Sequence, residues 1–251
     1  MFLPHQVRTT PYDLEALARL WKWESTIREQ LPQVLASGSI TILFQAIFDV
    51  SGEFPLLRAY EALARFPVAR RIPTGLWFSV AGQLGLAIDL ELATARKAID
   101  LVHRLPEGTV LFVNASPAVA LLLVDSVPRQ VSTRLVFDLP SGAASDPHCD
   151  WITKDLRDRG AGISLDDIPV EDSVAYLKAG TERPDYLKVD VASGVDVEVG
   201  GIDLARAAEW CRRNQLTLIA KRVERITDLH ALRELGIDWA QGYSLARPTE
   251  L

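Results

Sequence analysis

Carboxylate, amide and lysine side chains recur in this sequence at the ends of short apolar runs. These residues are Glu61, Asn114, Asp138, Asp166, Asp167, Lys188, Asp190, Lys221 and Gln241. Oxygen ligands of this kind suit Mg²⁺ or Mn²⁺, and two such ions can clamp the attacking and leaving oxygens of a phosphodiester. Carboxylates at strand ends also occur for solubility alone. A catalytic interpretation therefore requires a fold that brings the whole set together.

The sequence offers little for other common kinds of site. No two of the four histidines stand at zinc-ligand spacing. The sequence has no Walker-type phosphate loop, no dinucleotide-binding glycine fingerprint and no G-x-S-x-G nucleophile elbow. The two cysteines suit a reducing compartment and exclude a cysteine-rich zinc module.

Size and composition predict a single domain in the cytoplasm. At 251 residues the chain lies within the range of one α/β barrel. No uninterrupted apolar run approaches the roughly 20 residues that span a bilayer, and the N-terminus lacks a signal-peptide pattern. The net charge of −6 argues against a broad nucleic-acid surface, because such binding relies on Lys and Arg to neutralise phosphates. We therefore expect neither a membrane nor a nucleic-acid partner.

Eight short runs rich in β-branched or aromatic residues predict strands. They span Ile40–Phe48, Leu57–Leu63, Thr109–Val113, Arg134–Asp138, Gly162–Asp166, Tyr186–Val189, Leu216–Ala220 and Asp238–Gln241. Segments with helical spacing separate most of them, over Leu76–His103, Pro117–Val124, Asp150–Arg159, Val170–Ala179, Ile202–Arg213 and Thr227–Leu235. This alternation favours a mostly parallel sheet covered by helices.

The first two strands are joined by a turn over Asp49–Glu53, which is too short for a crossover helix, so they must pair antiparallel. The sequence thus predicts a (β/α)8 TIM-like barrel with an antiparallel first strand. In such barrels reactive groups lie at the carboxyl ends of the strands. The polar residues named above would then converge on one rim.

An N-terminal helix is predicted from Pro11 to about Gln30, with apolar residues at three- or four-residue spacing from Leu20 to Val34. Pro32 is expected to kink or divide it. The helix either packs on the barrel or serves dimerisation or a partner. We assign residues 1–20 to an N-terminal helical extension and residues 21–251 to the barrel domain.

Six segments at these positions resemble the EAL family of cyclic di-GMP phosphodiesterases. Tyr60–Arg65 carries the Glu-Ala-Leu signature and the arginine that follows it. The other matching segments are Phe44–Asp49, Val113–Pro117, Ser164–Asp167, Asp185–Asp190 and Ala240–Tyr243. They follow the family's order and spacing over about Trp21–Pro248.

The resemblance implies a barrel, often dimeric, that binds an extended cyclic dinucleotide and linearises it to pGpG with two divalent ions, Mg²⁺ or Mn²⁺. It implies metal ligands at Glu61, Asn114, Asp138, Asp166 and Asp167. In an active enzyme Lys188, Glu61 and Asp166 would be the catalytic residues, with Lys188 near the attacking water or phosphate. The implied nucleotide contacts are Gln45, Leu63, Arg65, Asn114, Asp190 and Gln241.

Four segments depart from the family pattern. Asp138 stands where the family usually has Glu, and Ser141 stands where it has a second Glu. The loop Ile168–Glu171 lacks the glycines of the family's turn, and Gly82 replaces a helical Glu. On the seventh strand Ala-Glu-Gly-Val-Glu becomes Ala-Lys-Arg-Val-Glu, so Lys221 replaces a metal-binding carboxylate.

Lys221 opposes metal binding by its charge. At about 4 Å and an effective dielectric near 20, a unit charge and a divalent ion repel by roughly 8 kcal/mol. Half of that repulsion is still about three decades in affinity. The flexible stem of lysine can also carry the ammonium out to solvent. If it remains inside, it can pair with Asp166 or Asp138 in place of a metal.

Three functions are compatible with these residues. We favour a degenerate EAL domain that acts as a cyclic di-GMP receptor or a signalling and interaction module, with lost or weak hydrolysis and no metal. The second is an active phosphodiesterase, because most of the ligand positions survive. The third is a protein-interaction module without a nucleotide, using the N-terminal helix and the loop Ile168–Glu171. A protein partner and a homodimer are compatible with all three.

Overall fold

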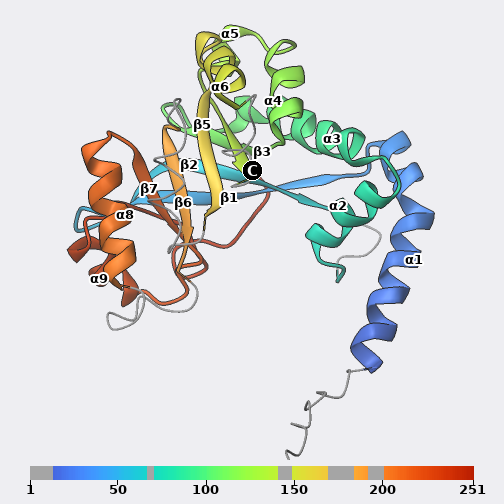
Figure 1. The fold of residues 1–251 in the computed structure, drawn as a ribbon, viewed down its shortest axis with the longest axis horizontal. Helices are drawn as coiled ribbons and strands as arrows, with labels where there is room; N and C mark the ends of the chain where they lie inside the picture. Colours follow the sequence, from blue (N-terminus) through green and yellow to red (C-terminus); the bar gives the residue numbers. More distant parts are fainter. Residues whose placement is uncertain (1–13, 67–70, 141–148, 169–183, 192–200) are drawn as a thin grey trace, which may run out of the picture.

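The computed structural model describes residues 14–66, 71–140, 149–168, 184–191 and 201–251. Its strands close into a barrel in chain order (Figure 1). They are β1 (Thr41–Asp49), β2 (Leu56–Arg65), β3 (Val110–Asn114), β4 (Leu135–Pro140), β5 (Gly162–Ile168), β6 (Tyr186–Asp190), β7 (Thr217–Lys221) and β8 (Trp239–Ala240). Strand β1 pairs antiparallel with β2 and β8, and all other neighbours pair parallel. The predicted TIM-like barrel with its reversed first strand is confirmed.

Helices cover the outside of the barrel, with α2 and α3 on one side and α8 and α9 on the other (Figure 1). The helices are α1 (Leu14–Ser37), α2 (Thr74–Gln83), α3 (Ala87–Asp100), the 3₁₀ turn η2 (Val102–Arg104), α4 (Pro117–Val124), α5 (Arg129–Ser132), α6 (Cys149–Asp158), α8 (Gly201–Arg213) and α9 (Asp228–Glu234). The helix expected over Val170–Ala179 lies outside the described residues. None of the described helices is long and apolar enough to cross a membrane.

The predicted single helix Leu76–His103 is wrong, because the chain breaks it into α2, α3 and η2. Gly85 has a φ of +72° and ends α2 in a Schellman motif. The Gly85 amide donates to Gly82 O at 3.2 Å, and the Leu86 amide donates to Ala81 O at 2.8 Å. The apolar periodicity continues across the break, which is why the spacing alone did not reveal it.

Helix α1 extends further than expected and is not divided at Pro32. The proline lies on the exposed side, where water can satisfy the carbonyl that loses its helical partner. Ile27, Leu31 and Val34 are buried, whereas the first turns project away from the barrel (Figure 1). The boundary proposed after residue 20 falls inside this helix and stays a prediction.

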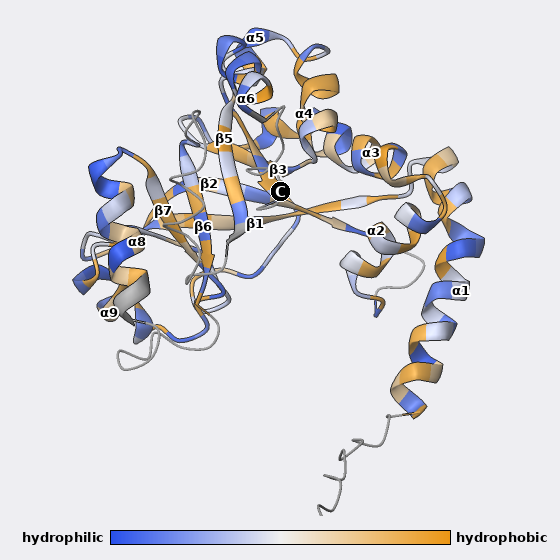
Figure 2. Cartoon of the chain, viewed as in Figure 1, coloured by the Kyte–Doolittle hydropathy of each residue, from blue (hydrophilic) through white to orange (hydrophobic). Residues whose placement is uncertain are grey.

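Apolar side chains from the strands form a layer inside the barrel, toward the amino-terminal ends of the parallel strands. Its members are Ile47, Ala59, Phe112, Val136 and Ile219, with Tyr186 and Trp239 packed against them. The aromatic rings of Phe112 and Tyr186 meet edge to face with centroids 5.0 Å apart. A separate, larger core lies between strands and helices, and the outer helices carry both hydrophobic and hydrophilic residues (Figure 2). The polar site therefore rests on a packed floor.

The loop after β8 packs directly on the loop after β7. The Val223 amide donates to Gln241 O at 3.0 Å, and the Ser244 amide donates to Val223 O at 3.2 Å. Gly242 makes this approach possible, since a Cβ there would lie 2.1 Å from the Val223 carbonyl oxygen. This contact holds the ends of β7 and β8 together at the rim.

We expect Gly242→Ala to lower the free energy of unfolding by about 2–3 kcal/mol, because the backbone of Val223 must shift. The matched control is Gly82→Ala within α2, where a Cβ meets nothing within 4 Å. It should stabilise the domain by up to about 1 kcal/mol, since alanine is the better helix former. Urea unfolding checks both, and equal effects of the two changes would contradict this account of the rim.

Candidate functional site

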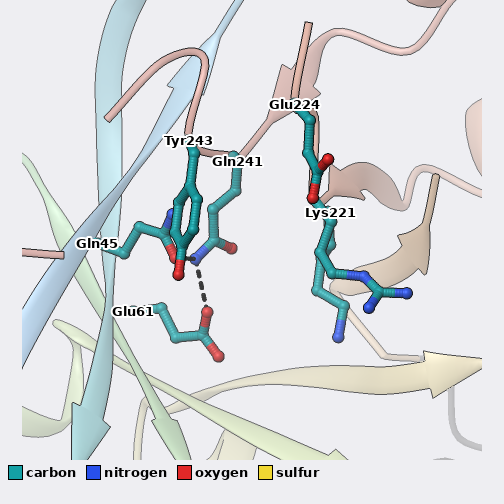
Figure 3. Close-up of a pocket in the computed structure, with 8 residues that line it drawn as sticks. Gln45, Glu61, Lys221, Glu224, Gln241 and Tyr243 are labelled. Atoms are coloured by element: carbon teal, nitrogen blue, oxygen red, sulfur yellow. Dashed lines mark hydrogen bonds between the residues drawn. The ribbon is translucent and has the colours of Figure 1, made fainter. Parts of the chain in front are cut away.

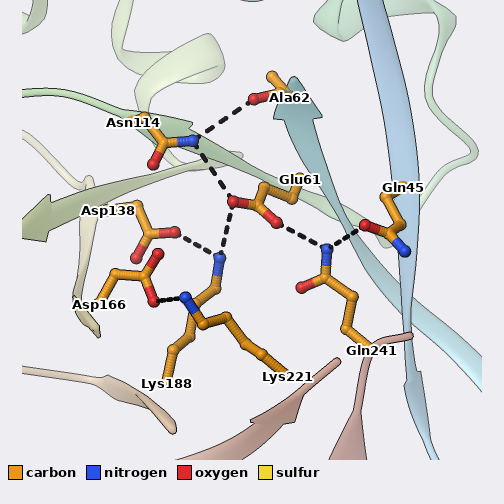
Figure 4. A network of polar contacts seen from close by, with 9 residues as sticks. All are labelled: Gln45, Glu61, Ala62, Asn114, Asp138, Asp166, Lys188, Lys221 and Gln241. Atoms are coloured by element: carbon orange, nitrogen blue, oxygen red, sulfur yellow. Dashed lines mark hydrogen bonds and ion pairs between the residues drawn. The ribbon is translucent and has the colours of Figure 1, made fainter. Parts of the chain in front are cut away.

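A polar layer lies above the apolar floor at the carboxyl ends of the parallel strands. Side chains alternate along a strand, so most polar residues of this layer lie two positions from an apolar residue of the layer below. Asn114 follows Phe112, and Lys221 follows Ile219. The layer consists of Gln45, Glu61, Asn114, Asp138, Asp166, Lys188, Lys221 and Gln241 (Figure 4). The fold thus brings these predicted site residues together.

Lys188 lies at the centre of the layer and is fully buried. Its ammonium forms an ion pair with Asp138 and lies 3.4 Å from Glu61 Oε1. It also lies 4.8 Å from the centroid of the Phe112 ring below, a cation–π contact. Burial by itself disfavours the ammonium form, but the surrounding carboxylates, Asp138 foremost, outweigh it and raise the pKa of Lys188. This lysine is therefore a permanent buried cation.

Glu61 links the lysine to a chain of amides. Gln241 Nε2 donates to Glu61 Oε2 at 2.6 Å and lies 3.0 Å from Gln45 Oε1. Asn114 Nδ2 lies 3.4 Å from Glu61 Oε1. Burial favours the neutral acid, but Lys188 and these hydrogen bonds outweigh it and hold the pKa of Glu61 below its ordinary value. Glu61 is a buried carboxylate with both oxygens engaged.

The pKa of Asp138 is set by opposing effects of burial and neighbouring charges. Burial is the largest and raises its pKa, Lys188 opposes that, and the negative charges of Asp166 and Glu61 raise it again, to about 6. Its Oδ1 atom is buried and accepts no hydrogen bond from the described protein atoms. The pKa of Asp138 is therefore raised, whereas that of Glu61 is lowered.

Lys221 reaches into the layer from the end of β7. Its ammonium forms an ion pair with Asp166, and the two side chains are only 14% and 12% exposed. Of the two outcomes considered from the sequence, escape to solvent and occupation of the acidic pocket, the structure shows the second (Figure 4). Asp166 therefore has an ammonium group as its neighbour on the side of β7.

Three carboxylates have the spacing of a metal site. One oxygen from each of Glu61, Asp138 and Asp166 lies within 4.8 Å of the others. This arrangement can hold one divalent ion. Asp167, the expected ligand of a second ion, lies on β5, but its side chain falls outside the described part of the chain. Lys188 and Lys221 together contact all three carboxylates. A metal would have to compete with these two ammonium groups for the carboxylate oxygens.

Two cavities flank Glu61. The larger, about 450 Å³, extends from Asp138 and Asp166 past Asn114 to α2, and the expected ligand contacts Leu63 and Arg65 line it. The smaller, about 320 Å³, is lined by Gln45, Glu61, Lys221, Arg222, Glu224, Gln241, Gly242 and Tyr243 (Figure 3). Glu61 is common to the linings of both cavities.

Asp190 and Arg222 form a separate pair at the rim. Asp190 was expected among the ligand contacts, and in the structure it forms an ion pair with Arg222. Arg222 was not predicted as a site residue. The family pattern has glycine at this position. Glu91 on α3 was also missed, because nothing in its sequence context marks it. Its Oε2 accepts a hydrogen bond of 2.8 Å from the Ser116 amide, just after Asn114.

The chain is similar in sequence to a known phosphodiesterase. A curated relative, the cyclic di-GMP phosphodiesterase PdeB of Shewanella oneidensis, is 24% identical over 245 residues, which cover 88% of this chain. The chain spans only 28% of the length of that relative.

Solved structures share the fold. The FimX EAL domain of Xanthomonas citri, solved with c-di-GMP, has a TM-score of 0.76 at 17% identity and covers 95% of this chain and 98% of its own. The FimX EAL domain of Pseudomonas aeruginosa, also bound to c-di-GMP, has a TM-score of 0.70 at 22% identity, covering 89% and 96%. The c-di-GMP-bound LapD S helix-GGDEF-EAL structure of Vibrio cholerae has a TM-score of 0.75 at 19% identity, covering 88% and 57%.

The family itself is identified by a direct match of its sequence model. The EAL domain model matches residues 28–248, from the middle of α1 to beyond β8. This range contains every residue of the polar layer described above. The chain therefore belongs to the EAL domain family.

Proposed function

We propose that this EAL domain binds cyclic di-GMP without a divalent metal and has lost, or nearly lost, its hydrolysis. It then acts as a receptor or signalling module. The observation that carries the proposal is the ion pair between Lys221 and Asp166 inside the acidic cluster. A residue that would donate a ligand oxygen in an active enzyme instead contributes a positive charge.

The charges of the polar layer support this proposal. A divalent ion between Glu61, Asp138 and Asp166 would meet two ammonium groups, one of them fully buried. The Lys188 side chain is fully buried, and the Lys221 ammonium is paired with Asp166. The donor set therefore does not fit two tightly bound ions, and we route no step of a reaction through them.

The groups needed to hold a nucleotide do not depend on metal. Arg65 and Asn114 line the larger cavity, and Gln45 and Gln241 line the smaller one. Guanidinium and amide groups suit phosphate oxygens and the polar edges of bases. The two FimX EAL domains were solved with c-di-GMP, and their fold is the fold of this chain. These points favour the dinucleotide over a small anion.

A weak phosphodiesterase is the second candidate, and one observation favours it. The oxygens of Glu61, Asp138 and Asp166 keep a spacing that can hold one ion. A bound Mg²⁺ or Mn²⁺ would supply an activated water there. The role of this chain would be to hold the ion with these carboxylates and to position the phosphate near Lys188.

Binding measured with and without metal separates these functions. We expect cyclic di-GMP to bind equally well in EDTA and in Mn²⁺, without formation of pGpG. Isothermal titration gives the affinity, and chromatography of the same samples detects product. Turnover to pGpG would identify the phosphodiesterase, and absence of any binding would leave the protein-interaction module.

Restoring the family residue should restore the metal site. We expect Lys221→Glu to raise Mn²⁺ affinity by about three decades, because a repulsive charge becomes a ligand. Lys97→Glu on α3 is the matched control, since it makes the same charge change where Lys97 donates to Gly38 O on the outside of the barrel. Mn²⁺ titration followed by electron paramagnetic resonance measures both. Equal affinities in the two variants would show that Lys221 does not exclude the ion.

The raised pKa of Asp138 predicts a pH dependence of stability. The folded chain holds this proton more tightly, with a pKa of about 6 against the ordinary 3.8. Its contribution to stability is therefore complete below about pH 4 and lost as pH rises through 6. The loss amounts to at most about 3 kcal/mol.

Asp138→Asn removes this proton-binding group with little change in shape. The variant should lack the corresponding fall in unfolding free energy between pH 4 and 6.5. Urea unfolding across that range provides the measurement. Parallel profiles for the variant and the wild type would contradict the raised pKa.

A further inference from the structure

Arg222 occupies a backbone conformation that favours glycine. Its φ is +57°, and among the described residues only Gln215 is another non-glycine residue with positive φ. Hydrogen bonds on both sides hold it there. The Val191 amide donates to Lys221 O at 3.1 Å, and the Val223 amide donates to Gln241 O at 3.0 Å. A strained residue that the rim maintains in this way is a candidate for a functional role.

The side chain of Arg222 lies where an anionic ligand would arrive. It lines the smaller cavity together with Gln241 and Tyr243. It is 62% exposed, and its ion pair with Asp190 lies at the surface. Such exposed pairs contribute little to stability, so the guanidinium can exchange Asp190 for another anion at small cost. Lys221, by contrast, is largely buried against Asp166.

The same cavity contains a buried acceptor. Gln241 is 3% exposed, and its Oε1 atom accepts no hydrogen bond from the described protein atoms. Its Nε2 atom is already engaged by Glu61 and Gln45. A ligand that carries both an anionic group and an N–H donor matches the chemistry of Arg222 and Gln241, which line the same cavity. A nucleotide has both.

We propose that Arg222 is a ligand-binding residue whose guanidinium contacts a phosphate of the bound dinucleotide. The inference rests on the proposed function. When no metal neutralises the phosphodiester, side-chain cations must do so, and the forked guanidinium matches two phosphate oxygens. The glycine of the family pattern has no such group. Arg222 thus supplies the positive charge for the phosphate that a metal would otherwise supply.

The test uses two substitutions with different backbone effects. Arg222→Gly removes both the charge and the strain, and Arg222→Gln removes the charge but keeps a side chain at positive φ. Arg58→Gln is the matched control, because Arg58 pairs with Asp49 at the opposite end of the barrel. Titration calorimetry with cyclic di-GMP in EDTA gives the affinities, and thermal unfolding gives Tm for each protein.

We expect both Arg222 variants to bind about ten- to a hundredfold more weakly, as for loss of a charge-assisted hydrogen bond. Arg58→Gln should bind as the wild type does. The Tm of Arg222→Gly should equal or exceed that of the wild type, since glycine relieves the strained backbone. Weaker binding without a lower Tm would show that Arg222 acts on ligand binding and not on the stability of the fold.

Three results would overturn the inference. If the wild type binds and both Arg222 variants bind equally well, Arg222 makes no contact and the proposed function still stands. If Arg222→Gly alone loses affinity and its Tm falls, the effect belongs to the backbone. If the wild type does not bind cyclic di-GMP at all, the inference and the proposed function fail together.

Discussion

The buried ammonium of Lys188 sets the requirement that the rest of the polar layer meets. A cation removed from water needs compensating negative charge and hydrogen bonds. Asp138 and Glu61 provide the charge, and the aromatic face of Phe112 lies beneath. Glu61 is in turn held by Gln241, which joins the last strand of the barrel to the second. Barrel closure and site geometry therefore depend on the same set of contacts.

Lys188 alone leaves this layer with an excess of carboxylates, which a divalent ion can balance. In this chain the end of β7 places two further cations beside these acids. Lys221 pairs with Asp166 and Arg222 pairs with Asp190. Two adjacent residues thus neutralise acids on two other strands from inside the protein. Tethered cations differ from a metal in one chemical respect: they stabilise negative charge but activate no water. This difference is the chemical basis of the receptor function proposed above.

Much of the fold could be predicted because two local signals agree with the tertiary structure. Short β-branched runs and the tight turn after Asp49 predicted the strands and the reversed first strand, all within two residues of the observed ends. The helix break at Gly85 was missed because a left-handed glycine does not interrupt the apolar spacing around it. Helix α1 passed through Pro32 because the proline lies on the exposed side.

The site was predicted less completely than the fold. Polar residues at strand ends converge because of strand alternation, which sequence reveals. Their pairing depends on side-chain reach across the barrel, which sequence does not reveal. Lys221 could have turned to solvent, and only the three-dimensional arrangement places it on Asp166. Glu91 escaped notice because its contact is with a backbone amide at the rim, and Arg222 because the cavity that it lines forms only in three dimensions.

The most direct test of the central claim is anomalous diffraction from crystals of the wild-type domain soaked in Mn²⁺ and cyclic di-GMP. The account predicts intact nucleotide across the strand ends, no anomalous peak between Glu61, Asp138 and Asp166, and the Lys221 ammonium still on Asp166. A manganese peak among these carboxylates, with Lys221 displaced toward solvent, would contradict it.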